Sequence, residues 1–134
     1  MKLHSFLLVL AATAAIMLVA HWMGLWITLG AHPWWSGSTT WFGIGGGVIV
    51  TSLTYVLLPK SLKSTMIQAG VFLLLAICAF ALSLYGKAGF VGSYAEDAFA
   101  GRLWYLGFIG FTFATFCTLA ALARFGRWSR KPFE

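Results

Sequence analysis

The chain has 134 residues, of which 60% are apolar and only 9% are charged, and its formal net charge is +6. A soluble domain carries about 25% charged residues, so this chain has too few charges to cover the surface of a soluble monomer. Disorder is excluded because it requires low hydrophobicity, and a total of two cysteines excludes a disulfide-dense secreted mini-protein. The composition therefore predicts a polytopic membrane protein.

Four apolar stretches approach the length of about 20 residues that a membrane-spanning helix needs. Each stretch is continuous rather than alternating, so we expect helices and an all-α integral membrane protein. The connections are short, which favours one domain over residues 1–134, folded as an up-down antiparallel bundle of four transmembrane helices. The predicted spans cover residues 6–29, 41–58, 65–85 and 103–123.

Two local patterns bear on where helices begin. The charged start and apolar run resemble a signal peptide, but the run continues past Ala20, so we expect an uncleaved first helix. Ser93 followed three residues later by Glu96 has the pattern of a capping box. This pattern predicts that the fourth helix starts near Tyr94, well before its apolar part.

Basic residues flank the apolar stretches, where they act as topology signals and headgroup anchors rather than as a nucleic-acid surface. With the N-terminus inside, seven lie on the cytoplasmic side, and only Lys87 and Arg102 lie on the other. We therefore expect both termini in the cytoplasm, in a bacterial inner membrane, and no nucleic-acid partner. The seven are Lys2, Lys60, Lys63, Arg124, Arg127, Arg130 and Lys131.

Small residues recur at three- and four-residue steps in two of the predicted spans. In lipid, such stripes let helices approach closely. We expect them to be seams between helices of one chain, while an oligomer contact or the lining of a transport path remains an alternative. The stripes contain Gly43, Gly47, Thr51 and Thr54 in the second span, and Gly107 and Gly110 in the fourth.

A few polar residues are candidates for a site on the outer side. His21 is ionisable inside a span, which is a functional hypothesis by default, and His32 could join it at a haem or copper site. A bis-His haem normally takes its ligands from different helices. No other predicted span contains a histidine, so we expect no cofactor. Glu96 and Asp97 diverge by about 100° on a helix, and we expect them to cap and solvate it while Arg102 reaches the headgroups.

Tryptophan is concentrated around the first outer loop, where five of the seven tryptophans lie. Tryptophan prefers the membrane interface, so an aromatic belt is the first interpretation. A contact surface for a partner or a lipid is the second, because tryptophan is enriched at binding hot spots. The residues are Trp22, Trp26, Trp34, Trp35 and Trp41.

The chain shows no nucleophile–base set, no metal-binding spacing and no charge at the centre of a predicted span. We therefore expect a non-enzymatic accessory subunit of a larger membrane complex (respiratory, transport or secretion), or a protective membrane protein. Its partners would be lipid and other membrane subunits, or further copies of itself. A small homo-oligomeric channel or transporter is the alternative. A redox or metal-binding protein that uses His21 and His32 is the second alternative.

Overall fold

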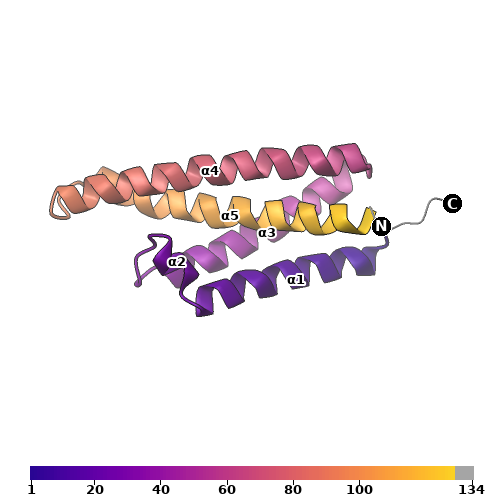
Figure 1. Ribbon diagram of the computed structural model, residues 1–134, viewed down its shortest axis with the longest axis horizontal. Coiled ribbons are helices and arrows are strands. Elements are labelled where there is room, and N and C mark those ends of the chain that lie inside the picture. Colours follow the sequence, from indigo (N-terminus) through magenta and orange to yellow (C-terminus); the bar gives the residue numbers. More distant parts are fainter. Residues whose placement is uncertain (129–134) are drawn as a thin grey trace.

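The computed structural model describes residues 1–128, and this part of the chain is helical with short connections. The four long helices alternate in direction, so the N-terminus and the end of the last helix lie at the same end of the molecule (Figure 1). This order agrees with the predicted up-down arrangement. The helices are α1 (Leu3–Trp22), α2 (Leu25–Thr28), α3 (Ser36–Leu57), α4 (Leu62–Gly92) and α5 (Ala98–Trp128).

The four long helices are each long and apolar enough to span a membrane, which gives the chain the build of a membrane protein. Three of them, α3, α4 and α5, are longer than the predicted spans, and the excess is largest in α4 and α5. α4 and α5 have 31 residues each, and a helix of that length extends about 46 Å, against about 30 Å of hydrocarbon in a bilayer. As a result, the turn between α4 and α5 projects past α2 at one end of the molecule (Figure 1).

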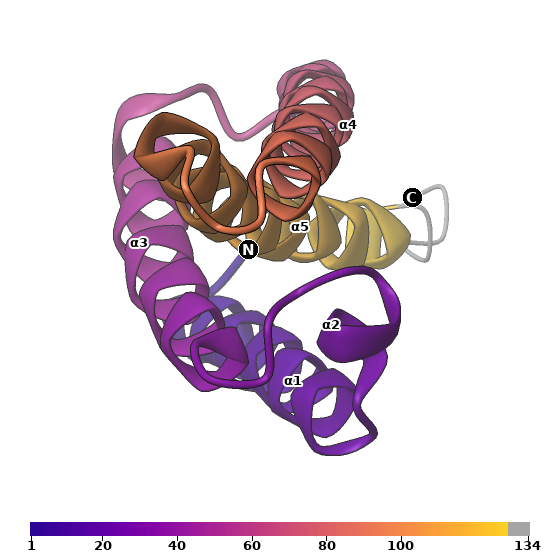
Figure 2. The same ribbon diagram turned by 90° about the vertical axis from the view of Figure 1, so that its left-hand side faces the viewer.

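The helix α5 is central to the packing. It contacts α1, α3 and α4, whereas α4 packs chiefly against α5. Viewed from the end, α5 lies between α4 on one side and the pair of α1 and α3 on the other (Figure 2). Of the four apolar helices, α5 is the most buried and α4 is the least. The bundle is therefore layered, and α4 is left open on most of its surface.

The first predicted span is wrong at its C-terminal end. A continuous helix was expected over residues 6–29, but α1 ends at Trp22 and Gly24 follows with φ 74°. This left-handed conformation is open to glycine at little cost and ends helices. The chain then forms the single turn of α2 and bends again at Gly30, where φ is 108°. The segment folds back against the bundle instead of extending α1.

The predicted capping box before the fourth helix is also wrong. Tyr94 and Ala95 adopt positive φ angles of 55° and 67°, so the chain turns there and α5 begins only at Ala98. Asp97 is the residue that caps the helix, because its Oδ1 accepts a hydrogen bond from the N–H of Ala100 at 3.0 Å. The hydroxyl of Ser93 accepts from the N–H of Asp97 at 2.9 Å, so it fixes the turn.

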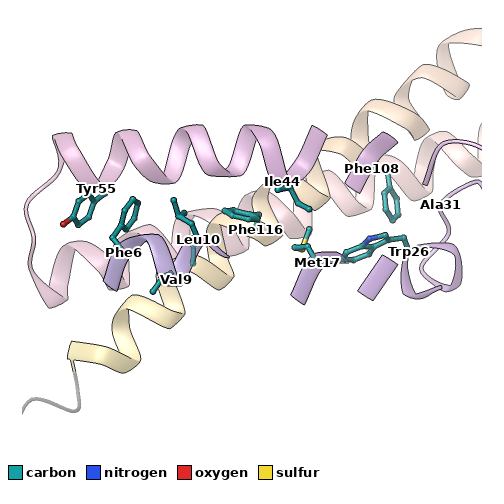
Figure 3. Packing of buried hydrophobic residues seen from close by; sticks show 11 residues of the cluster. Phe6, Val9, Leu10, Met17, Trp26, Ala31, Ile44, Tyr55, Phe108 and Phe116 are labelled. Atoms are coloured by element: carbon teal, nitrogen blue, oxygen red, sulfur yellow. The ribbon is translucent and has the colours of Figure 1, made fainter. Parts of the chain in front are cut away.

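The apolar core runs along the length of α1, α3 and α5 (Figure 3). At one end, Phe6 stacks on Tyr55 with ring centroids 4.0 Å apart. At the other end, Trp26 from α2 closes the core against Phe108 (Figure 3). A cluster this continuous ties α2 and both ends of the bundle to α5. Its buried members are Phe6, Val9, Leu10, Met17, Trp26, Ala31, Ile44, Tyr55, Phe108, Phe116 and Ala120.

Candidate functional site

The tryptophans around the first loop divide into two groups. Trp22 and Trp34 are 87% and 92% exposed, and Trp41 is also exposed. Trp26 is only 3% exposed, and Trp35 is half-buried. The surface that this loop offers to a membrane interface or to a partner therefore consists of three tryptophans rather than five.

The inward-facing tryptophans join an aromatic cluster on α5. The ring of Trp26 lies edge-on to Phe111 at 6.0 Å. Trp35 lies 5.3 Å from Trp104 and equally close to Tyr105. The indole N–H of Trp104 donates a hydrogen bond to the carbonyl of Gly30 at 2.9 Å. Trp104 thus anchors the loop, a role that the sequence did not indicate because this residue lies outside the tryptophan-rich segment.

The candidate histidines His21 and His32 have different surroundings. His32 lies inside the aromatic cluster, 5.7 Å from Trp104, and its Nδ1 accepts a hydrogen bond from the N–H of Trp34 at 3.1 Å. His21 lies in the last turn of α1, with its imidazole beside Gly37. Within residues 1–128, no three His, Cys, Asp or Glu side chains are grouped so as to hold a metal ion. The arrangement at His32 serves the shape of the loop.

Side chains of α5 fill the space beside the small residues of α3. A β-carbon at Gly43 would lie 2.7 Å from the β-carbon of Thr112, and one at Gly47 would lie 2.5 Å from the Cγ of Phe116. Thr51 donates a hydrogen bond to the sulfur of Cys117 at 3.8 Å. In this chain the stripe therefore forms a seam between α3 and α5.

The small residues of α5 face α4 in the same way. A β-carbon at Gly107 would lie 2.8 Å from the backbone nitrogen of Ser83, and one at Gly110 would lie 3.3 Å from the β-carbon of Ala79. The hydroxyl of Ser83 donates to the carbonyl of Trp104 at 2.9 Å. Thr54, the remaining member of the two stripes, is half-buried and donates to the carbonyl of Thr51 on its own helix.

The charged residues at the turn between α4 and α5 are all exposed. Glu96 and Asp97 lie in the connection, and Arg102 lies in the second turn of α5. One carboxylate oxygen of Asp97 is already used as the helix cap. Asp97 therefore caps α5, and all three side chains are open to the surroundings at the projecting turn.

Arg124 is the residue that the sequence placed least well. It was expected among the basic residues that flank the spans as topology signals and headgroup anchors, but its side chain is only 3% exposed. Its Nη1 donates to the Oε1 of Gln68 at 3.2 Å, and its guanidinium carbon lies 5.9 Å from the ring centre of Tyr55. Its Nε has no partner within the described part of the chain. Its spacing from the buried Cys117 and Ala121, at seven and three residues, was the available signal.

Two other basic residues, Lys60 and Lys63, lie at the same end of the bundle as Arg124. The ammonium of Lys60 lies 4.6 Å from the ring centre of Tyr55, whose hydroxyl donates to the carbonyl of Met1 at 2.8 Å. Lys63 lies in the first turn of α4 and is exposed. Arg130 and Lys131, which were also expected on the cytoplasmic side, lie outside the described residues.

Comparison of the chain with family models, with curated proteins and with solved structures finds no match. The class defined by the fold is a helical protein whose four long helices are fit to span a membrane.

Proposed function

We propose that this protein is a non-catalytic accessory subunit that docks against the transmembrane helices of another membrane protein through the outward face of α4. The observation that supports the proposal is the one-sided packing of α4. Although it is one of the two longest helices, it packs chiefly against α5 and is the least buried of the four. The other face of α4 is free to receive a partner.

The outward face of α4 has the composition of a helix–helix contact. Gly70 and Gly92 have open space where a β-carbon would be, and Ala81 and Ala88 are exposed. Small residues at such spacing let a second helix approach closely and gain dispersion contacts that lipid tails do not replace as well. The stripe is completed by larger residues, and its members are Gly70, Leu74, Ile77, Ala81, Tyr85, Ala88 and Gly92.

The face that α4 turns inward is different. Its buried residues are mostly polar or small, as expected for a helix that has already found its partner within the chain. Large exposed residues occur on both α3 and α4, for example Phe42 and Ile49 on α3 and Leu73 and Leu82 on α4, and they suit contact with lipid beside the stripe. The inward residues of α4 are Thr65, Gln68, Ala76, Ser83 and Gly86.

The orientation that we propose places both termini in the cytoplasm, in a bacterial inner membrane. By the bounds of the helices, the end that contains the N-terminus holds five basic residues of the described part, Lys2, Lys60, Lys63, Arg124 and Arg127, and the opposite end holds Lys87 and Arg102. Basic residues are retained on the cytoplasmic side. The exposed tryptophans Trp22, Trp34 and Trp41 would then mark the outer interface.

The test is purification of the tagged protein from its native membranes, with the mass and composition of the complex measured. We expect a stoichiometric complex with an unrelated membrane subunit, and we expect Ala81→Leu to remove that subunit because the added side chain prevents close approach. Ala15→Leu is the matched control, since Ala15 is exposed on α1. The complex should survive this change.

Three outcomes contradict the proposal. The wild-type protein purifying alone with lipid would leave α4 as a lipid-facing helix. A stable complex of identical chains that conducts ions in liposomes would favour the channel alternative. A haem band in the visible spectrum, or copper in stoichiometric amount, would favour the redox alternative and return attention to His21 and His32.

A further inference from the structure

Positive charge collects at the end of the bundle that contains the N-terminus, with no carboxylate to balance it among the described residues. Lys60, Lys63 and Arg124 lie there. Glu96 and Asp97, the only carboxylate side chains of residues 1–128, both lie at the opposite end, in the turn between α4 and α5. A cluster of this kind attracts an anion.

One of these positive charges, that of Arg124, is buried. Burying a charge is costly unless it is paired and hydrogen-bonded. The described surroundings of Arg124 supply a neutral amide from Gln68 and the face of the Tyr55 ring, and its Nε remains without a partner. A bound anion close to this end of the bundle would supply the missing negative charge.

Gln68 links the buried Arg124 to polar groups at the start of α4 through hydrogen bonds. A guanidinium only donates hydrogen bonds, so the oxygen of the Gln68 amide must face Arg124 and its NH₂ must face the other way. The NH₂ donates to the hydroxyl oxygen of Ser64 at 3.1 Å, and the N–H of Ser64 donates to the hydroxyl oxygen of Ser61 at 3.1 Å. Both hydroxyls therefore act as acceptors inside the protein, and their protons remain available to an external acceptor.

A groove of about 350 Å³ lies where these donors meet. Most of its exposed surface is apolar, and the polar residues along it are Ser61, Lys63, Ser64 and Gln68. The N-terminus of α4 begins at Leu62, so the positive end of its dipole and its free N–H groups add to the attraction for an anion. The remaining lining is apolar, from Leu58, Pro59 and Ile67.

We propose that this groove binds an anionic phospholipid, with the phosphate group against Lys63 and the serine hydroxyls and the apolar part of the lipid along the groove. The lysine and the serine hydroxyls are donors suited to phosphate oxygens. The apolar part of the lining continues into Met66 and Ile67, which are exposed on the membrane-spanning surface of α4, where acyl chains would lie. Inorganic phosphate shares the headgroup chemistry but would leave this apolar wall unused. The proposal does not depend on the accessory-subunit function.

The test is a thermal unfolding titration of the purified full-length protein in a neutral detergent, with phosphatidylglycerol, phosphatidylcholine or inorganic phosphate added. We expect phosphatidylglycerol to raise the unfolding temperature at a lower concentration than phosphatidylcholine does. In a Lys63→Gln/Ser64→Ala variant, the half-saturating concentration of phosphatidylglycerol should rise by about tenfold or more, the effect of losing one charge-assisted hydrogen bond. Lys63 is exposed, and Ser64→Ala removes one internal hydrogen bond, to the NH₂ of Gln68, so the unliganded variant should still fold but with a lower unfolding temperature. Each lipid titration is therefore compared with the unliganded protein of the same variant.

The matched control is Arg102→Gln, which removes one exposed cation at the opposite end of the bundle. It should leave the half-saturating concentration unchanged. Equal weakening in both variants would show diffuse attraction to charge and overturn the proposal, as would equal stabilisation of the wild type by the two lipids. If inorganic phosphate stabilises the protein as well as phosphatidylglycerol does, and both effects disappear in the double variant, the lipid assignment is overturned.

Discussion

Trp26 and Trp104 are almost equally buried, at 3% and 6% exposure, yet only one of them uses its indole N–H. Trp104 donates to the carbonyl of Gly30, and this bond holds the loop after α2 against α5. The indole N–H of Trp26 finds no acceptor within the described residues. A buried donor without an acceptor loses its hydration and gains nothing in return, so these two side chains should contribute differently to stability.

We predict that Trp104→Phe lowers the free energy of unfolding by about 1–2 kcal/mol more than Trp26→Phe does. Both changes remove similar apolar volume, but only the change at Trp104 breaks a hydrogen bond and leaves a buried carbonyl unpaired. The difference is measured by thermal or denaturant unfolding in detergent. Far-ultraviolet circular dichroism monitors the helix content, so the readout does not depend on tryptophan fluorescence. Equal losses, or a larger loss at Trp26, would contradict this account of the loop.

The order of the long helices could be predicted from apolar length alone, because each helix that crosses a bilayer needs about 20 such residues. The ends of the helices could not, because they depend on single turn residues. Gly24 stops α1 inside an unbroken apolar run, and Asp97 rather than Ser93 caps α5. The pattern Ser-x-x-Glu was present, but the positive φ angles of Tyr94 and Ala95 place a turn between those two residues.

The corrected start of α5 gives a prediction that separates the two capping schemes. Asp97→Ala should lower the free energy of unfolding by about 1 kcal/mol, because it removes the acceptor for the N–H of Ala100. Glu96→Ala should have an effect within about 0.5 kcal/mol, the usual range for an exposed residue without such a role. Parallel unfolding curves in one detergent compare them. A larger loss for Glu96→Ala would restore the capping box.

The central position of α5 was beyond the reach of the sequence patterns. All four spans are apolar, and both α3 and α5 carry stripes of small residues, so either could have been the middle helix. The structure distinguishes them through pairs such as Gly47 with Phe116 and Gly107 with Ser83, in which α5 uses a different face toward each neighbour. The burial of Arg124 has the same cause. It lies on a face of α5 that packs against other helices, so it is buried although it follows the last predicted span.

The separation of charge along the whole molecule predicts one orientation in the membrane. Pro59 lies at the basic end, and Tyr94, which is 93% exposed, lies at the projecting turn. In a Cys78→Ala background, we expect a membrane-impermeant maleimide to label Tyr94→Cys in intact bacterial cells. It should label Pro59→Cys only after the membranes are permeabilised, because basic residues hold that end in the cytoplasm. The readout is the mass shift of the labelled chain.

The background variant serves as the control, since its remaining cysteine, Cys117, is buried and should stay unlabelled under both conditions. The reverse pattern would place the groove beside Lys63 on the outer face and would contradict the proposed topology. Labelling of both sites in intact cells would indicate that the chain inserts in two orientations. Such a result would mean that the five described cations at one end do not outweigh the two at the other. The labelling pattern therefore tests the charge argument independently of any partner or lipid.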